Sequence, residues 1–240
     1  MSGHSKWSQI KRQKGAADAR RGTLYTKMGH MIALAAREGG KDPSMNFRLR
    51  LALEKARAAN MPSATIERAI RRGAGELAGE DQIQPVIYEG YGPGGAAVLV
   101  DAATNNKNRT AAEVRHILAK YGGAVGAVGG VQWLFETRGI ITLGSDKITE
   151  QQELLLIDAG AQDITQSGDA ARVTTRPDQL ESVRQHIERA GIVVRETEVV
   201  LVPKNLVRFS SDQDRERFLK LVNELENIEE VTRVTSNAQT

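Results

Sequence analysis

Positive charge is concentrated at the start of this 240-residue chain, and its natural chemistry is the neutralisation of phosphate. Residues 2–21 hold six Lys and Arg residues against one acid, with a tryptophan among them. Three further arginines follow at the i, i+3, i+4 spacing of one helix face. The candidate nucleic-acid-binding residues are therefore Lys6, Trp7, Lys11, Arg12, Lys14, Arg20, Arg21, Arg68, Arg71 and Arg72.

A second candidate for anion binding is the segment TNNKNRT at residues 104–110. A helix is expected to begin near Thr110, and Asn108 can cap it. The N–H groups at a helix N-terminus, together with the cations Lys107 and Arg109, also suit a phosphate. Two interpretations stay open, which are helix capping alone or an anion site formed by Lys107, Asn108 and Arg109.

The segment GYGPGG at residues 90–95 matches the glycine spacing G-x-G-x-x-G. In a dinucleotide-binding unit these glycines follow a strand and open a helix. Here they precede the apolar run AAVLV, and Pro93 has no N–H to offer a phosphate. The context favours a tight turn, and phosphate binding is the alternative.

Patterns for catalysis, metal binding and membrane insertion are missing from the sequence. There is no cysteine, and the four histidines share no ligand spacing. No run of about 20 apolar residues is present, and no apolar h-region follows the basic start. We therefore expect no catalytic residue, no metal, no cofactor and no membrane contact, and a cytoplasmic location; the oligomeric state stays open.

The charge is divided along the chain. Residues 1–80 hold 16 Lys and Arg against 7 Asp and Glu, whereas residues 81–240 hold 17 against 23. A solvated charged face and an anionic partner are both compatible with this pattern.

No motif for reading bases is clear in the sequence. No three- to four-residue turn before a clear recognition helix stands out, and Trp133 and Phe135 alternate as in a packed strand. These features favour the reading of phosphates and shape over the reading of bases.

Three helices are expected in the basic part. The first covers about residues 16–38, and the basic residues before it are predicted to form an extended arm. The second would be capped by Asp42, with Pro43 at its first position, and the third by Ser63. The expected apolar face of the second helix is Phe47, Leu51 and Ala58.

The rest of the chain has an α+β pattern. The expected order over residues 132–203 is β-α-β-β-α-β, the ferredoxin-like arrangement. The segments on either side are too short to fold alone, so we predict that they form one discontinuous domain. The fold class is α+β and multidomain, with a three-helix domain and two ferredoxin-like domains, one inserted in the other. The predicted domains are 1–78, 79–131 plus 206–240, and the inserted 132–205.

Several segments together resemble the YebC family, which includes the mitochondrial translational activator of cytochrome oxidase subunit one. They are SGHSKWSQIKRQKGAADARRGTLYTK at the start, EKARAANMPSATIERAIRRG at 54–73, YEGYGPGG at 88–95 and NKNRTAAEVRH at 106–116. The resemblance implies a helical domain and two α+β domains, one inserted in the other, and carries no established catalytic residues. Where members usually show Thr-Asp-Asn-Arg-Asn-Arg, residues 104–109 read TNNKNR, so one acid is lost and one Arg becomes Lys.

Three functions follow as expectations. The leading one is a non-enzymatic nucleic-acid-binding factor that acts on ribosomal or other structured RNA, since some members of the family resemble ribosome-associated factors that help translation. The alternative is a DNA-binding transcriptional regulator, the usual description of bacterial members. A more remote alternative is a phosphate-ligand enzyme that uses residues 90–95 and Arg109.

Overall fold

The computed structural model describes the backbone of residues 3–77, 79, 81–145, 147–167 and 170–239. Within these ranges it describes side chains from residue 21 onward, except that of residue 167. The chain divides into two compact units, Met1–Gln132 with Val207–Thr240, and Trp133–Leu206. The sequence-based boundary near residue 78 falls inside the first unit and stays a prediction.

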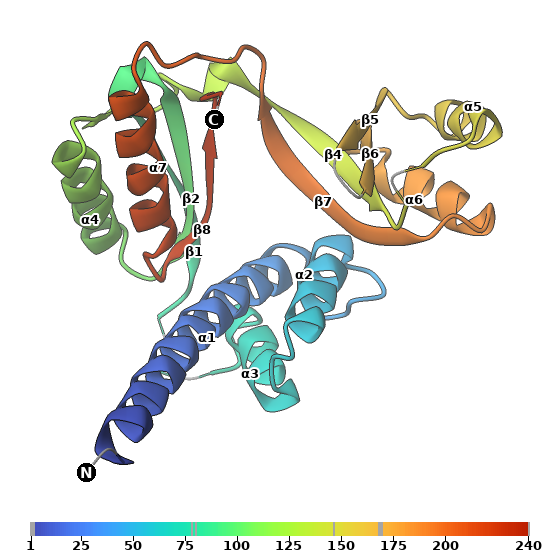
Figure 1. Cartoon of the computed structure of the whole chain (residues 1–240). Helices are drawn as coiled ribbons and strands as arrows, with labels where there is room; N and C mark the ends of the chain where they lie inside the picture. The colour runs from blue at the N-terminus through green and yellow to red at the C-terminus, as the bar shows by residue number, and fades with distance from the viewer. Residues whose placement is uncertain (1–2, 78, 80, 146, 168–169, 240) are drawn as a thin grey trace. The chain divides into compact units, whose positions relative to one another are not determined.

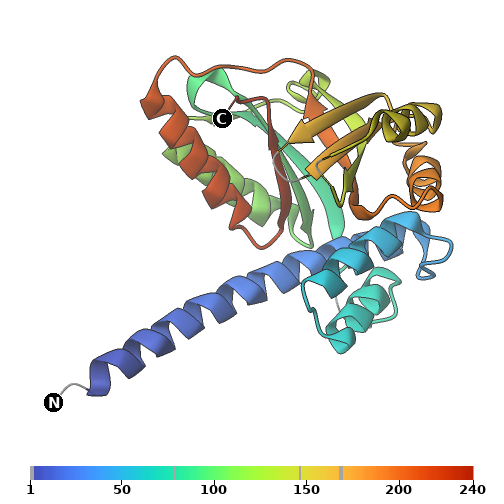
Figure 2. The ribbon, with the colours of Figure 1, turned by 45° about the vertical axis from the view of Figure 1, so that its right-hand side comes forward.

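The first unit begins with the three expected helices, α1 (Gly3–Gly39), α2 (Phe47–Ala58) and α3 (Ser63–Gly73), and α2 and α3 pack beside the C-terminal half of α1 (Figure 2). No proline interrupts α1, and Gly40 ends it in the left-handed conformation with φ +86°. The helix therefore begins at Gly3, so the prediction of an extended arm before Ala16 is wrong. The helices share a core of Ile32, Ala36, Leu49, Leu53, Ala56, Met61 and Ile66.

The predicted start of the second helix is also wrong. Asp42 accepts hydrogen bonds from the backbone N and the Oγ of Ser44, at 2.9 and 2.7 Å, and so forms a turn. The N-cap is Asn46, whose Oδ1 accepts a hydrogen bond from Leu49 N at 3.0 Å. Its Nδ2 donates to Ala35 O at 2.7 Å, so this buried cap also ties α2 to α1.

The displaced start changes the face that α2 buries. Its buried residues are Leu49, Ala52, Leu53 and Ala56. The expected face of Phe47, Leu51 and Ala58 is instead half-buried or exposed. In α3 the N-cap is Pro62, without a side-chain hydrogen bond, and Ser63 is the first helical residue.

The first unit continues as a four-stranded antiparallel sheet of β1 (Gln84–Tyr91), β2 (Ala97–Thr104), β3 (Ala124–Val125) and β8 (Val231–Ser236) in the order β3-β1-β2-β8. Helices α4 (Lys107–Lys120) and α7 (Asp212–Glu226) cover one face (Figure 1). Their shared core includes Val98, Val100, Val114, Leu118, Phe218 and Leu221. On the other face, Ala103 packs with Ile83 and with Ala33 and Leu34 of α1.

A buried carboxylate holds the glycine-rich segment that follows β3. Glu89 accepts hydrogen bonds from the backbone N–H groups of Gly129, Val131 and Gln132, at 2.5, 2.7 and 2.9 Å. Burial alone would raise the pKa of this carboxyl, but the three donors outweigh it and leave the pKa below its usual value. Glu89 therefore fixes a segment whose own side chains are too small to pack extensively.

The second unit is formed by β4 (Phe135–Leu143), α5 (Glu150–Asp158), β5 (Asp163–Ser167), β6 (Ala170–Thr175), α6 (Leu180–Arg189) and β7 (Val194–Pro203). Its antiparallel sheet has the order β5-β6-β4-β7. The predicted β-α-β-β-α-β order is present here, and the α+β multidomain class is confirmed. The first unit has the same two layers, but its element order after α3 is β-β-α-β-α-β.

Trp133 does not pack in a strand as the sequence suggested. It lies in a short 3₁₀ turn, Gln132–Leu134, and its exposed fraction is 64%. Phe135 begins β4 and is buried. The alternation is therefore broken between these two aromatic residues, because the strand begins only after the turn.

Candidate nucleic-acid interface

Most of the N-terminal cations lie where the structure describes only the backbone. Lys6, Trp7, Lys11, Arg12, Lys14 and Arg20 belong to α1, but their side chains lie outside the described residues. Arg21 is the first of the set with a described side chain, and it is exposed. The contribution of the earlier residues to binding therefore stays a prediction.

Helix α3 presents Arg68 and Arg71 on its exposed side. Ile66 and Ala69 occupy the opposite, buried side and pack into the three-helix core. Arg71 Nε lies 3.8 Å from Glu76 Oε2, and Glu76 accepts a 2.6 Å hydrogen bond from Lys41 Nζ. Both ion pairs are exposed, so they restrain these cations only weakly. Arg68 and Arg71 are thus exposed cations on one side of α3.

Arg72 differs from its two neighbours. It is half-buried, and its NH2 group donates to the backbone O of Asp81 at 3.3 Å. This bond joins the end of α3 to the segment before β1. Sequence spacing placed Arg72 in one stripe with Arg68 and Arg71, whereas the structure gives it a contact that supports the fold.

The turn between α2 and α3 has the length of the turn in a helix-turn-helix. The helices are joined by the four residues 59–62, in which Asn60 has φ +58°. A connection of three to four residues between two helices is typical of a helix-turn-helix. A connection of this length is present, with Arg68 and Arg71 on the second helix. That no clear recognition helix follows it stays a prediction.

The candidate anion site lies at the first turn of α4. Its N-cap is Asn106, whose Oδ1 accepts a hydrogen bond from Arg109 N at 3.1 Å, so the expectation that Asn108 caps the helix is wrong. Lys107 and Asn108 are exposed residues of the first turn. The NH2 group of Arg109 lies 2.5 Å from Glu230 Oε1 and 3.2 Å from Asn105 Oδ1. An incoming anion would therefore compete with Glu230 for this guanidinium.

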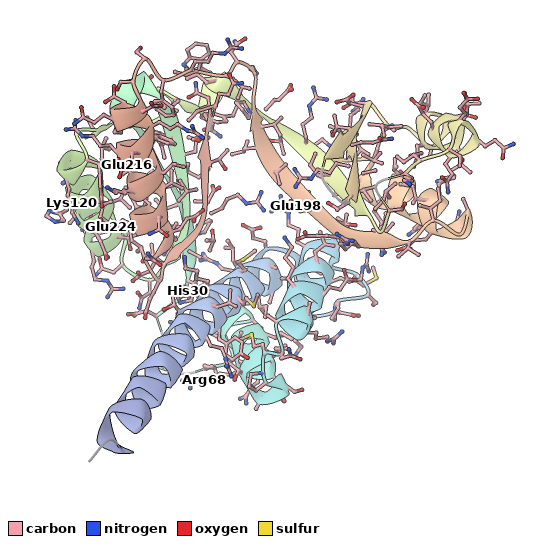
Figure 3. All side chains as sticks on the ribbon, in the orientation of Figure 1. His30, Arg68, Lys120, Glu198, Glu216 and Glu224 are labelled. Carbon is pink, nitrogen blue, oxygen red and sulfur yellow. The ribbon has the colours of Figure 1, made fainter. Side chains whose placement is uncertain are left out.

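Glu230, which pairs with Arg109, also influences a histidine of α1. His30 of α1 interacts electrostatically both with Glu230 and with Arg72. Burial and the charge of Arg72 lower the pKa of His30, and Glu230 opposes that shift. His30 is therefore neutral near pH 7 and adds nothing to the positive surface. Figure 3 shows His30 on α1 and Arg68 on α3.

The Gly90–Gly95 segment forms the tight turn between β1 and β2. Gly92 N donates to Ala96 O at 2.8 Å, and Gly94 has φ +68°. A Cβ at Gly92 would lie 2.9 Å from the side chains of Phe218 and Leu221, so the turn packs closely on α7. These contacts account for the glycines without a phosphate.

Other kinds of site have no support in the described part of the chain. No group of three or more His, Cys, Asp and Glu side chains there could hold a metal ion. No described helix is both long enough and apolar enough to span a membrane.

Two protein-family models match the chain. The TACO1/YebC protein N-terminal domain matches residues 5–76, and the TACO1/YebC second and third domain matches residues 83–238. A relative from Thermoanaerobacter pseudethanolicus, named a probable transcriptional regulatory protein, is 46% identical over 100% of this chain and 97% of its own length. One of the same description from Thermotoga maritima is 48% identical over 99% and 93%.

A solved structure is similar over the same range. The crystal structure of a conserved hypothetical protein from Aquifex aeolicus superposes with a TM-score of 0.82 and is 41% identical. The match covers 92% of this chain and 91% of that one. The likeness therefore extends through the helices and both sheets.

Proposed function

The chain belongs to the TACO1/YebC family, and on that premise we propose that it is a non-enzymatic, nucleic-acid-binding regulator of gene expression that acts on structured RNA at the ribosome. The observation that carries the proposal is the division of charge, +9 in residues 1–80 against −6 in the remainder. Such a surface attracts phosphates whatever their sequence. The names of the relatives support the regulatory role.

The composition of α3 favours the reading of phosphates over the reading of bases. In a helix-turn-helix, residues at the N-terminus of the second helix contact base edges. In α3 these are Ser63, Ala64 and Thr65, whose side chains are short. The long cations Arg68 and Arg71 come one and two turns later and suit a phosphate backbone.

A DNA-binding transcriptional regulator is the second candidate, and the four-residue turn between α2 and α3 favours it. In that case α3 would enter a major groove, and specificity would require a preferred duplex. A specific DNA site is typically bound at least about a thousandfold more tightly than random DNA. Such a preference, measured against structured RNA at one salt concentration, would replace our leading proposal.

The test of the leading proposal is a salt series with the double variant R68Q/R71Q, measured by fluorescence anisotropy on ribosomal RNA fragments and by co-sedimentation with ribosomes. Each lost phosphate contact should reduce the slope of log K against log salt by roughly 1. Arg72 stays unchanged because its bond to Asp81 supports the fold. The matched control is R172Q/R189Q, which removes two exposed arginines of the second unit.

The outcomes of this test are distinct. We expect weaker binding and a smaller slope for R68Q/R71Q, and wild-type values for the control. Equal effects of both pairs would mean that only net charge matters. Wild-type binding by R68Q/R71Q would mean that these two arginines are only solvated and do not contact the RNA. Absence of any RNA or ribosome binding by the wild type would refute the proposal.

A further inference from the structure

The segment before α7, the first turn of α7 and Gln239 line an open polar cavity in the first unit, far along the chain from the basic helices. Its volume is about 630 Å³, which lies in the range of small-molecule sites. Two arginines, one aromatic ring and several hydrogen-bonding groups line it. They are Arg208, Phe209, Ser210, Ser211, Arg215 and Gln239, with Asp212 beside them.

Backbone pairing fixes both walls of this cavity. Val207 N donates to Asn237 O at 2.7 Å, and Gln239 N donates to Val207 O at 2.8 Å. Arg208 Nε donates to Gln239 Oε1 at 2.9 Å, so a side-chain bond joins the same two segments. The arginine is therefore held in place although it is exposed.

The position of the aromatic ring depends on the glycine turn. Phe209 packs on Phe218 with ring centroids 5.3 Å apart. Behind it lies Gly94, where a Cβ would come within 2.8 Å of Phe209 Cδ1. The ring can take this position only because residue 94 has no side chain. The turn thus has a role beyond joining β1 and β2, since it supports the aromatic wall of the cavity.

The lining combines three kinds of recognition. Arginine binds phosphate by charge-assisted hydrogen bonds, and Arg215 makes no hydrogen bond or ion pair through its side chain among the described residues. An aromatic ring offers a surface on which a base can stack. Asp212 and Gln239 offer hydrogen-bonding groups to a base edge. A bare phosphate would meet the Asp212 carboxylate, whereas a nucleotide separates its phosphate from its base.

We propose that this cavity binds one unpaired nucleotide of an RNA strand, with Arg215 and Arg208 on the phosphate and Phe209 against the base. The proposal rests on the proposed function, because it assumes RNA as the partner. It adds a second contact region that reads single-stranded character, which the cations of α3 do not distinguish. Unpaired bases are the usual targets of specific RNA recognition, because only they expose their faces and edges.

The experiment compares the full-length wild type with R215Q, F209L and R217Q by fluorescence anisotropy. The probes are an unstructured twelve-nucleotide RNA and an RNA hairpin whose stem is closed by a non-nucleotide linker, so that every base in it is paired, with AMP, GMP, CMP and UMP as competitors. Arg217 is the matched control, because it is exposed on α7 and lies about 200° around the helix from Arg215. Leucine at position 209 keeps apolar packing on Phe218 and removes the stacking face.

We expect F209L to weaken binding of the single strand by about fivefold or more, and R215Q by about tenfold or more, which are the lower ends for one base stack and one charged hydrogen bond. Binding of the hairpin should not change, and R217Q should match the wild type. Circular dichroism melting confirms that the variants are folded, and a conservative F209Y variant, which keeps an aromatic ring, should restore binding.

Other outcomes separate this proposal from the function it rests on. Single-strand binding at wild-type strength by both R215Q and F209L overturns the cavity proposal and leaves the proposed function standing. Binding of the hairpin alone by the wild type does the same. Competition by a mononucleotide as strong as by the strand overturns it in favour of a free nucleotide ligand. Failure of both RNAs to bind contradicts both proposals.

Discussion

The two sheets of this molecule have the same layers, but they differ in what lies on the face opposite their helices. In the first sheet, β2 is buried along almost its whole length, with only Asp101 half-buried. In the second, β4 alternates, so that Ile141 and Leu143 are buried while Arg138 and Thr142 are half-exposed. Figure 3 labels Glu198 on β7, which is a half-buried acid of the second sheet.

This difference shows how the first sheet is packed against the basic helices. A strand that is covered on both faces reads as a nearly continuous apolar run, as AVLVDAAT does. A strand with one open face alternates, as FETRGIITL does. The second face of the first sheet packs against α1, and α1 in turn packs against α3, the helix that carries Arg68 and Arg71.

The largest expected effect comes from placing a charge on the face of each sheet that lies opposite its pair of covering helices. Ala103 is fully buried against α1, so A103E would leave an unpaired charge in the interior and lower the free energy of unfolding by about 3–5 kcal/mol. T142E on β4 should change it by less than about 0.5 kcal/mol. Urea unfolding followed by circular dichroism measures both, and similar losses would mean that the two faces are equally covered.

The next effect concerns Glu89, the buried carboxylate that holds the glycine-rich segment of the first unit. E89Q replaces a charged acceptor of three backbone donors and should lower the free energy of unfolding by about 3 kcal/mol, given the strength of hydrogen bonds to charged groups. Because the pKa of Glu89 is lowered by folding, this stability is full above the usual carboxyl pKa of about 4.3. It is lost as the pH falls through the lower folded-state pKa.

Urea unfolding between pH 7 and pH 3 checks this prediction. The gap between wild type and E89Q should be constant at neutral pH and narrow toward pH 3. A gap that does not change with pH would mean that the Glu89 side chain acts by its shape and not by its charge.

Adding a methyl group on the helix-covered face should lower the free energy of unfolding by a similar amount in both sheets. A Cβ at Gly90 would lie 2.7 Å from Ala124 O and 3.0 Å from Leu118, and one at Gly139 would lie 2.4 Å from Thr175 Oγ1 and 2.9 Å from Leu180. G90A and G139A should each cost about 2 kcal/mol by overpacking. Thermal unfolding of the two variants, compared with an exposed G22A control in α1, tests whether the packing under the helices is equally tight.

The smallest expected effect is a loss of stability at low pH that comes from His30 of α1. The pKa of His30 is lowered by burial and by Arg72, and raised by Glu230. The unfolded chain therefore takes up this proton first, and stability decreases as the pH falls below the usual histidine pKa of about 6.5. Urea midpoints at pH 7.5 and 5.5 should differ less for H30N than for the wild type; an unchanged difference would contradict the assignment.

Local patterns predicted the elements better than the contacts between them. The β-α-β-β-α-β order expected over residues 132–203 is present, because the apolar spacing within each segment favours one type of element. The start of α2 was misplaced because Asp42 and Asn46 both have cap chemistry, and only the contact of Asn46 with Ala35 in α1 decides between them. Such a tertiary contact leaves no trace in the spacing of either residue.

The candidate interface shows the same limit. Spacing correctly placed Arg68 and Arg71 on one exposed side of α3. It could not show that Arg109 pairs with Glu230, a residue 121 positions further along the chain. It also gave no signal for Glu89, whose partners are backbone N–H groups 40 to 43 positions away. Pairings of this kind depend on the order of strands in the sheet.

The pairing of β4 with β7 has a consequence for how this chain can change. Phe135, where the second unit begins its first strand, lies opposite Pro203, where its last strand ends. Opposite residues of antiparallel strands are only about 5 Å apart, so the unit leaves and rejoins its host at neighbouring points. A short hairpin turn spans the same gap, and exposed connections of this kind tolerate insertion and removal. Removal of the second unit would therefore leave two chain ends that a short turn can join.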